Sequence, residues 1–164
     1  MSIKKSTIEQ AGYGLFYEGE DPIPINTYFG PYKGKKFTRS EFKARNEAEG
    51  LDADKDCPYA VGVGKDDNNQ TLIYYDPGND FDKQENCLAM INMANHYDDG
   101  LNVMFKHNVL NDKMYFHVIK PILGGSEILT SYGEKYANFL GIDFETYFPE
   151  DCIYNENQKR RRGK

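Results

Sequence analysis

The side chains best suited to bind a metal ion are the cysteines and histidines, and their spacing argues against a metal site. The set comprises Cys57, Cys87, Cys152, His96, His107 and His117. No two cysteines form a Cys-x-x-Cys pair, and no histidines follow them at the spacing of a zinc finger. Scattered cysteines in odd number are typical of reduced thiols inside a cell. We therefore expect no metal site.

The aromatic content predicts a folded core. Of 164 residues, 13 are Tyr, 10 are Phe and none is Trp, and 39% are hydrophobic. This composition is typical of a globular protein, and the length fits one ordinary domain. We expect residues 1–150 to form that domain and residues 151–164 to form a basic, disordered tail.

The charge balance is acidic, with 20 Lys and Arg against 26 Asp and Glu and a formal net charge of −6. Because phosphate backbones are bound through Lys and Arg, the body of the chain is not expected to bind nucleic acid. An acidic surface suits a basic protein or peptide better. The exception is the sequence KRRRGK at residues 159–164, which fits a nuclear import signal, a nucleic-acid contact or a merely solvated terminus. We expect nuclear localisation, with the cytoplasm as the alternative.

Targeting segments are not evident. Residues 1–10 lack the apolar core of a signal peptide, and no window approaches the ~18 apolar residues of a membrane-spanning helix. We expect no contact with a membrane and a protein that stays inside its cell, unless it is exported by a route that the sequence does not reveal.

Hydrophobic periodicity and breaker residues predict many short strands and few helices. Thr38 and Glu41 form a capping-box pattern, and Gly50 supplies a stop, so a helix is expected between them. Strands are expected over residues 2–8, 14–18, 23–28, 59–63, 71–75, 101–106, 115–119 and 126–132, and short helices over 85–93 and 133–140. The result is a compact, strand-rich domain.

Several sequence blocks resemble SET domains, and they occur in the order in which that family has them. Ala-Gly-Tyr-Gly-Leu-Phe at residues 11–16 is similar to the family's opening Gly-x-Gly-Leu-Phe, and residues 28–34 are similar to the strand and turn that follow it. Ile91-Asn92-Met93 and then Leu101-Asn102 are similar to the family's two Asn-containing blocks. Residues 125–133, GSEILTSYG, are similar to its Gly-Glu-Glu-Leu-Thr-x-x-Tyr-Gly block.

The departures from the common SET pattern favour the PR branch of the family. Met93 stands where most SET domains have His, and an acidic insert, NHYDD at residues 95–99, precedes Asn102. Cysteine-rich flanks that hold zinc in many SET enzymes are missing from this sequence. The resemblance implies the SET β-clip fold, which is mostly β with short helices and has a threaded, pseudoknot-like crossing near its C-terminus; Asn102 is expected to tie that crossing.

The resemblance also implies a chemistry, which is methyl transfer from S-adenosylmethionine to a lysine amine of a protein, most often a histone. Free lysine has a pKa near 10.4, so such a site must desolvate the ammonium and align the neutral amine with the methyl group. By resemblance, the hydroxyl of Tyr132 is the catalytic group that orients both. Tyr132 can also be read as one more half-buried tyrosine at the end of a strand.

Cofactor contacts are implied for Gly12, Tyr13, Gly14, Asn92, Met93 and Tyr75. Glycine lets a ligand approach the main chain closely, although an ordinary tight turn uses glycine in the same way. A thioether cannot replace both imidazole nitrogens of a histidine, so Met93 could weaken cofactor affinity.

Aromatic residues are the candidates for the lysine channel. Tyr75 and Tyr136 could line it, and Phe144 or Tyr147 could close it without a metal ion; packing against the domain itself is the equal alternative for each. Two other functions stay open at this point. One is a SET fold with weak or no catalysis that binds partners, which Met93 and Ser126 favour, and the other is methylation of a non-histone protein.

Overall fold

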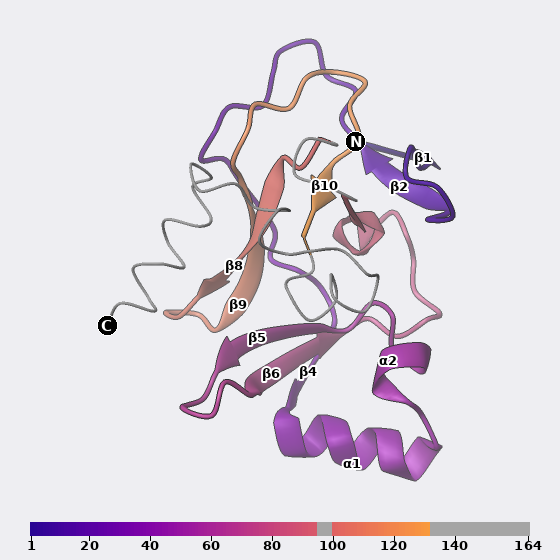
Figure 1. Ribbon diagram of the computed structural model, residues 1–164, viewed down its shortest axis with the longest axis vertical. Helices are drawn as coiled ribbons and strands as arrows, with labels where there is room; N and C mark the ends of the chain where they lie inside the picture. Colours follow the sequence, from indigo (N-terminus) through magenta and orange to yellow (C-terminus); the bar gives the residue numbers. More distant parts are fainter. Residues whose placement is uncertain (95–99, 132–164) are drawn as a thin grey trace. The chain divides into compact units, whose positions relative to one another are not determined.

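The computed structural model of the 164-residue chain describes residues 1–94 and 100–131. The chain divides into two compact units (Figure 1). Of the described residues, unit 1 comprises 1–28, 90–94, 100–105 and 116–131, and unit 2 comprises Phe29–Ala89 and Lys106–Tyr115.

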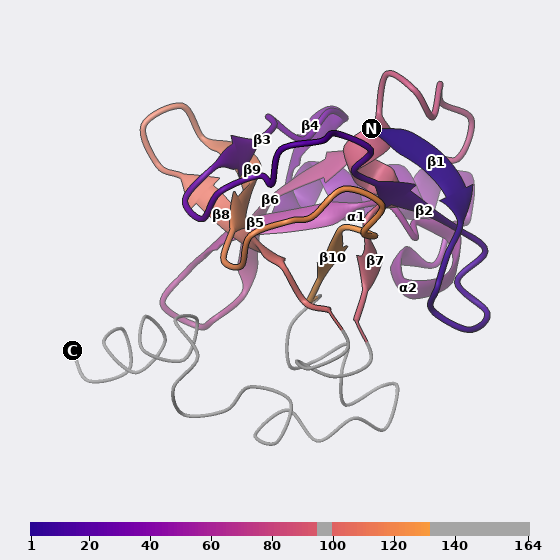
Figure 2. The same cartoon turned by 90° about the horizontal axis from the view of Figure 1, so that it is seen from above.

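Unit 1 is built from two small pairs of strands. β1 (Ser2–Lys5) and β2 (Tyr13–Phe16) are antiparallel, with Ser2 opposite Phe16. β7 (Asn92–Met93) and β10 (Leu129–Thr130) are parallel and lie side by side in Figure 2. Single bridges extend these pairs by joining Phe16 of β2 to Glu127 and Leu129 of β10 to Leu101, and a separate bridge joins Ile23 to Ile122.

The core of unit 1 consists of aliphatic and aromatic side chains that these short strands bring together. Its fully buried members include Leu15, Leu101, Val103, Phe116, Val118, Ile122 and Ile128. They come from segments far apart in the sequence. Burial of such side chains contributes about 1.5–3 kcal/mol each, which holds together strands that are too short to be stable alone.

Unit 2 contains an antiparallel sheet in the order β4-β6-β5, formed by β4 (Lys35–Thr38), β6 (Thr71–Asp76) and β5 (Val61–Lys65). α1 (Arg39–Glu49) follows β4 directly, and α2 (Ala53–Asp56) is a single turn. The 3₁₀ turn η1 (Cys87–Met90) lies where the chain passes from unit 2 to unit 1.

α1 begins and ends where the sequence predicts. Thr38 accepts a hydrogen bond from the Glu41 N–H, and the Glu41 carboxylate accepts one from the Thr38 N–H, so the capping box is complete. Gly50 adopts a left-handed conformation with φ 66° and ends the helix. Phe42 then stacks on Tyr74 of β6, with ring centroids 4.2 Å apart.

The hydrophobic core of unit 2 includes one buried thiol. Cys57 packs with Phe37 and Phe42, and burial raises the pKa of its thiol. A protonated thiol is a weak nucleophile, so Cys57 acts here as a small apolar side chain.

A third sheet has the order β3-β9-β8, from β3 (Tyr28–Phe29), β9 (Lys113–Val118) and β8 (Val103–Asn108). The long strands β8 and β9 each begin in one unit and end in the other. In unit 1, Tyr28 stacks on His117 at 4.8 Å, and His117 bonds to the side chain of Asn26 at 2.7 Å.

The prediction of a mostly β fold with short helices is confirmed, but the expected strand over residues 23–28 is wrong. Only Ile23 makes a bridge there, and β3 begins at Tyr28. Pro22 and Pro24 have no N–H to donate, and Asn26 adopts φ 69°, so the segment cannot continue a ladder. The single-turn helix α2 was not predicted. The helix expected over 133–140 lies outside the described residues, and the threaded crossing stays a prediction.

Within residues 1–94 and 100–131, no helix is long and apolar enough to cross a membrane. In the same part of the chain, no group of three or more His, Cys, Asp or Glu side chains is placed to hold a metal ion.

Candidate functional site

The side-chain amide of Asn92 connects β7 to Tyr13, the first residue of β2. Its Nδ2 donates to the carbonyl of Tyr13 at 2.9 Å and to Oε1 of Glu127 at 3.2 Å. The parallel pairing of β7 with β10 places Asn92 opposite Leu129, two residues after Glu127. The structure therefore brings together three of the residues expected to bind the cofactor, namely Tyr13, Gly14 and Asn92.

Glu127 is a nearly buried carboxylate, 6% exposed, whose partners are neutral donors. Its Oε1 accepts from the Ser6 hydroxyl at 2.7 Å, and its Oε2 accepts from the Thr7 N–H at 2.7 Å and the Thr7 hydroxyl at 2.5 Å. None of the ion pairs among the described residues involves this side chain. A carboxylate this buried depends on its hydrogen bonds, because removal from water without partners is costly.

Gly14 lies directly against this carboxylate. A Cβ atom at position 14 would be 2.0 Å from Oε1 of Glu127 and 3.1 Å from Nδ2 of Asn92. No side chain fits there, so the second glycine of the Gly-Tyr-Gly motif is required by the approach of Glu127 and Asn92.

Gly12 is required for a different reason. Its φ is 73°, which favours glycine, and a Cβ there would meet no atom within 4 Å. The main chain at Gly12 thus borders open space, and the neighbouring Tyr13 side chain is 59% exposed. An open glycine beside an exposed tyrosine fits the close approach of a ligand to the loop.

Met93 follows Asn92 in β7 and is buried, with 6% of its surface exposed. It pairs with Thr130 of β10. A buried thioether offers only a weak acceptor, so Met93 supplies shape to this position rather than a hydrogen bond.

Tyr75 belongs to unit 2, and its hydroxyl is already engaged. It donates to the backbone carbonyl of Asp112, and burial raises the pKa of its phenol. Its predicted contact with the cofactor stays a prediction, as do the roles proposed for Gly12, Tyr13, Gly14, Asn92 and Met93.

The predicted catalytic residue Tyr132 lies outside the described residues. The same is true of the predicted channel residues Tyr136, Phe144 and Tyr147, and of the basic tail at 151–164. Their roles also stay predictions.

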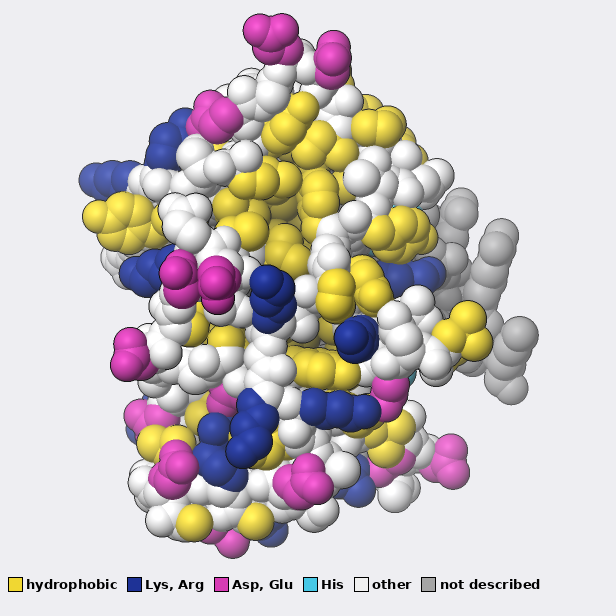
Figure 3. Space-filling view, turned by 180° about the vertical axis from the view of Figure 1, so that it is seen from behind, with side chains coloured by type: hydrophobic (Ala, Val, Ile, Leu, Met, Phe, Trp, Pro, Cys, Tyr) yellow, Lys and Arg dark blue, Asp and Glu magenta, His cyan; other side chains and the backbone are white. Residues whose placement is uncertain are grey.

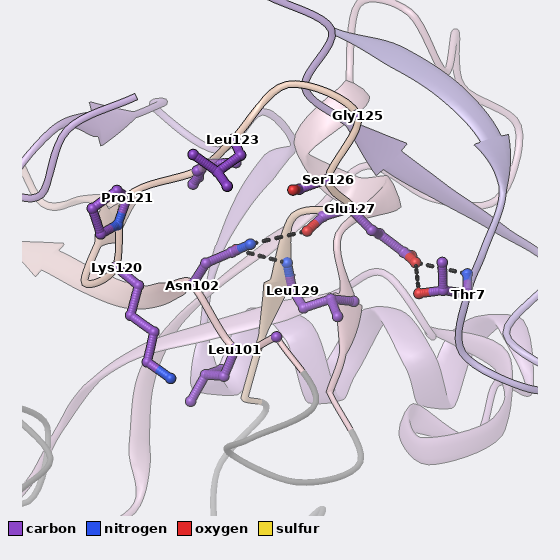
Figure 4. A pocket seen from close by; sticks show the side chains of 12 residues that line it. Thr7, Leu101, Asn102, Lys120, Pro121, Leu123, Gly125, Ser126, Glu127 and Leu129 are labelled. Carbon is purple, nitrogen blue, oxygen red and sulfur yellow. Dashed lines mark hydrogen bonds between the residues drawn. The ribbon is translucent and has the colours of Figure 1, made fainter. Parts of the chain in front are cut away.

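A cavity of about 370 Å³ lies in unit 1, between the segment 100–102 and the loop that leads to β10 (Figure 4). Leu101, Leu123 and Leu129 give it apolar walls, and Thr7 and Glu127 line it on the side of the carboxylate cluster. Asn102 lines it as well, and its side chain donates to the carbonyl of Glu127 and accepts from the N–H of Leu129, each at 2.9 Å.

Reasoning from the sequence missed Glu127, Ser6 and Thr7 as members of the site. Glu127 stands inside the quoted block at residues 125–133, and an acid without a nearby base in a strand of apolar residues is the signal that could have identified it. Ser6 and Thr7 gave no such signal, because they lie about 120 positions away from their partner.

Comparison with known proteins gives the family. The family model for the PR domain of PR domain zinc finger protein 2 matches residues 1–143. A curated relative, histone-lysine N-methyltransferase set-17 of Caenorhabditis elegans, is 31% identical over 136 residues, which cover 83% of this chain and 42% of the relative. The chain thus spans less than half the length of that relative.

Solved structures show the same fold at lower identity. The methyltransferase domain of human PR domain-containing protein 2 aligns at 23% identity with a TM-score of 0.53, covering 81% of this chain and 77% of that one. CpSET8 from Cryptosporidium aligns at 21% with a TM-score of 0.57, covering 80% and 56%. Polycomb repressive complex 2 of Chaetomium thermophilum, in an autoinhibited conformation bound to S-adenosylmethionine, aligns at 23% with a TM-score of 0.54, covering 85% and 16%.

These matches confirm the SET-type fold that the sequence blocks suggested. The match to the family model covers both the Gly-Tyr-Gly loop and the Asn92–Glu127 contact. The chain belongs to the PR-domain family.

Proposed function

We propose that this chain is a protein-lysine methyltransferase domain that uses S-adenosylmethionine and acts on a basic protein segment, a histone tail being the leading substrate. The observation that carries the proposal is the bond from Asn92 to the carbonyl of Tyr13, because it joins the two sequence blocks expected to hold the cofactor. Membership of the PR-domain family and the name of the set-17 relative support the same activity.

Residues 12–14, where β2 begins, fit the methionine end of the cofactor. Open space at Gly12 and the exposed ring of Tyr13 leave the main chain accessible, while Asn92 and Glu127 fill the opposite side of Gly14. When bound, S-adenosylmethionine supplies a methyl group carried on a positively charged sulfur.

In this proposal the protein orients the cofactor and the lysine amine and removes water from around the amine. Asn92 holds the loop in one conformation before the ligand arrives, which reduces the entropy lost on binding. In this proposal Tyr132 orients the lysine amine, and aromatic residues of the channel exclude water and favour the neutral form of the amine.

A basic substrate is supported by charge. The chain has a formal net charge of −6. On the face shown in Figure 3, Lys and Arg side chains lie among Asp and Glu side chains, so this face does not present the uniform basic field that a phosphate backbone requires. Acidic groups speed the encounter with a basic peptide without selecting its sequence. A histone substrate would place the protein in the nucleus, and the KRRRGK sequence would serve for import.

The test combines binding and transfer. Calorimetry should show binding of S-adenosylmethionine to the full chain, and radiolabelled methyl groups should appear on a panel of histones, located by mass spectrometry. Tyr132→Phe should abolish transfer, and Asn92→Ala should weaken cofactor binding, whereas Asn79→Ala, at an exposed turn, should change neither. Binding of the cofactor without transfer to any lysine would contradict the proposal.

A non-catalytic module for protein binding is the second candidate, and Met93 favours it. A buried thioether stands where most SET domains have a histidine, so a hydrogen-bonding group is missing from this position. Absence of cofactor binding at millimolar concentration would support this candidate. If the cofactor binds but histones are not methylated, transfer to other basic proteins of a cell extract tests the third possibility, a non-histone substrate.

A further inference from the structure

We propose that Glu127 is a positioning residue that fixes the side chain of Asn92 and holds the loop 6–14 at both of its ends. This loop comprises the connection from β1 to β2 together with the first two residues of β2. This inference rests on the proposed function in one respect only, which is that the loop binds S-adenosylmethionine. The hydrogen bonds of Glu127 to Ser6, Thr7 and Asn92 form a clamp on this loop. The clamp can be measured without the cofactor.

The carboxylate of Glu127 is saturated with donors. A carboxylate offers about four acceptor positions, and Glu127 uses all of them. Oε1 receives the Ser6 hydroxyl and the Asn92 amide, and Oε2 receives the N–H and the hydroxyl of Thr7, as Figure 4 shows for Thr7. Three donors come from Ser6 and Thr7 at the start of the loop, and one comes from Asn92, the residue that holds its end.

The backbone of Glu127 is fixed independently of its side chain. Its carbonyl accepts from the buried Asn102 amide at 2.9 Å, and Glu127 forms a bridge with Phe16 of β2. The carboxylate is therefore presented from a rigid segment, which is the arrangement that a positioning residue needs.

Glu127 determines which way the Asn92 amide faces. Both of the groups that Nδ2 contacts, the Tyr13 carbonyl and the Glu127 carboxylate, can only accept a hydrogen bond. A flipped amide would direct its oxygen at two acceptors, so only one orientation is compatible with the site. In that orientation Oδ1 receives no hydrogen bond among the described residues and can accept one from a ligand.

The same carboxylate ties the start of the loop to its end. Ser6 and Thr7 bind Glu127 with their side chains, and the Ser6 N–H donates to the Gly12 carbonyl at 2.8 Å. Asn92, held by Glu127, binds the next residue, Tyr13. One buried side chain thus closes the loop that carries the proposed cofactor contacts.

Glu127→Gln tests the clamp because an amide has one acceptor oxygen and one donor group. The oxygen of the introduced amide is expected to face Thr7, which offers the shorter contacts. The NH₂ group of the introduced amide then faces the NH₂ group of Asn92, and the two donors repel, which displaces the Asn92 amide from the Tyr13 carbonyl. We expect amide hydrogen exchange over residues 12–14 to speed up by about tenfold or more, the loss of one hydrogen bond being worth about 1.4 kcal/mol. The dissociation constant for S-adenosylmethionine should rise by a similar factor.

Two comparisons separate positioning from a general loss of stability. Thr38→Ala removes the N-cap of α1, which costs about 1 kcal/mol of stability without removing any contact of the Glu127 cluster, so it should change cofactor affinity by less than about twofold. In an Asn92→Ala background, Glu127→Gln should cause no further loss of affinity, because the contact through which it acts is already absent. If the double variant loses cofactor affinity by the product of the two single-variant factors, the proposal is overturned.

The outcome does not depend on catalysis or on the folding of one variant. If the wild-type chain fails to bind S-adenosylmethionine, the proposed function is wrong, and exchange over residues 12–14 still decides the clamp. If Glu127→Gln does not fold, the wild-type protein decides it by NMR. The Asn92 side-chain amide should exchange at least about tenfold more slowly than that of the exposed Asn68. Equal rates at Asn92 and Asn68, or unchanged exchange over 12–14 in a folded Glu127→Gln variant, would contradict the inference.

Discussion

The side chain of Asn102 accepts a hydrogen bond from the backbone N–H of Leu129 at 2.9 Å, in place of a backbone partner. Its Nδ2 donates to the Glu127 carbonyl, and its own N–H donates to the Leu129 carbonyl at 3.0 Å. Asn102 is 7% exposed, so these backbone groups have little access to water. The asparagine thus joins two segments of unit 1 that short strands alone would hold weakly.

Asn102→Ala is therefore expected to be strongly destabilising. It leaves a carbonyl and an N–H without their partners, and each buried group left unsatisfied costs about 1–3 kcal/mol. Urea denaturation should show a loss of about 2–4 kcal/mol in the free energy of unfolding. The same substitution at Asn79, which is exposed, should cost well under half of that. Equal losses of unfolding free energy at the two positions would contradict a special contribution of the Asn102 hydrogen bonds to stability.

Gly14→Ala and Gly12→Ala should differ in their effects although they alter the same loop. An alanine at position 14 would place its Cβ 2.0 Å from the Glu127 carboxylate, so the acid must leave its site. At position 12 there is space, and the cost is only the left-handed conformation, about 1–2 kcal/mol. We expect the Gly14 variant to show the larger loss of stability in urea denaturation. A Gly14 variant as stable as the Gly12 variant would contradict the close contact between position 14 and the Glu127 carboxylate.

Helices and strands were predicted best from the sequence where neighbouring residues alone determine their ends. The capping box of Thr38 and Glu41 and the stop at Gly50 define α1 without help from the rest of the fold. The hairpin of β5 and β6 was also expected, because β-rich residues flank a polar loop. By contrast, residues 23–28 look apolar enough for a strand, but Pro24 within the segment and Pro22 just before it have no N–H to donate to a ladder.

Part of the site could be predicted because the Gly-Tyr-Gly and Asn92 blocks have recognisable sequences. The Glu127 cluster could not, since its partners meet only through tertiary packing of residues about 120 positions apart. A hydrogen bond between distant residues leaves no periodic pattern in the sequence. The same reason explains why the pairing of β7 with β10 was not foreseen.

Arg45 is expected to stabilise unit 2 more than Arg39, the other arginine of α1. Its Nη2 lies 2.5 Å from Oδ2 of Asp76, whose side chain is only 3% exposed. Arg45→Met would leave that carboxylate buried without its cation, which typically costs 3–5 kcal/mol, so we expect a loss of about 3 kcal/mol in urea denaturation. Arg39 also forms an ion pair at 2.6 Å, with Asp66, but its side chain is 45% exposed. Arg39→Met should therefore cost no more than about 1 kcal/mol. A cost for Arg39→Met as large as that for Arg45→Met would contradict the role of burial.

The turn between β8 and β9 should respond to acid through Asp112. Hydrogen bonds from His107 and then from Lys36 lower the pKa of this carboxyl below its ordinary value. Because the pKa is lower in the folded than in the unfolded chain, the contact stabilises the fold above the ordinary pKa of aspartate. That contribution is lost as the pH falls through the lowered folded-state pKa.

An NMR titration of the Asp112 carboxyl should show the lowered pKa directly. His107→Phe should raise it more than Lys36→Gln does, since His107 is the larger cause. The reverse order would show that the lysine dominates.

Thr130→Val is expected to stabilise the protein, which is unusual for a substitution in a buried strand. The side chain of Thr130 is fully buried next to Met93 in the β7–β10 pair, and its hydroxyl has no hydrogen-bond partner among residues 1–94 and 100–131. A buried hydroxyl without a partner costs about 1–3 kcal/mol, and valine has nearly the same shape without that group. We expect the free energy of unfolding to rise by about 1 kcal/mol in urea denaturation. Thr38→Val should have the opposite sign, because that hydroxyl caps α1 and its loss costs about 1 kcal/mol. Destabilisation by Thr130→Val would mean that the hydroxyl is bonded in solution, contrary to the geometry of the β7–β10 pair.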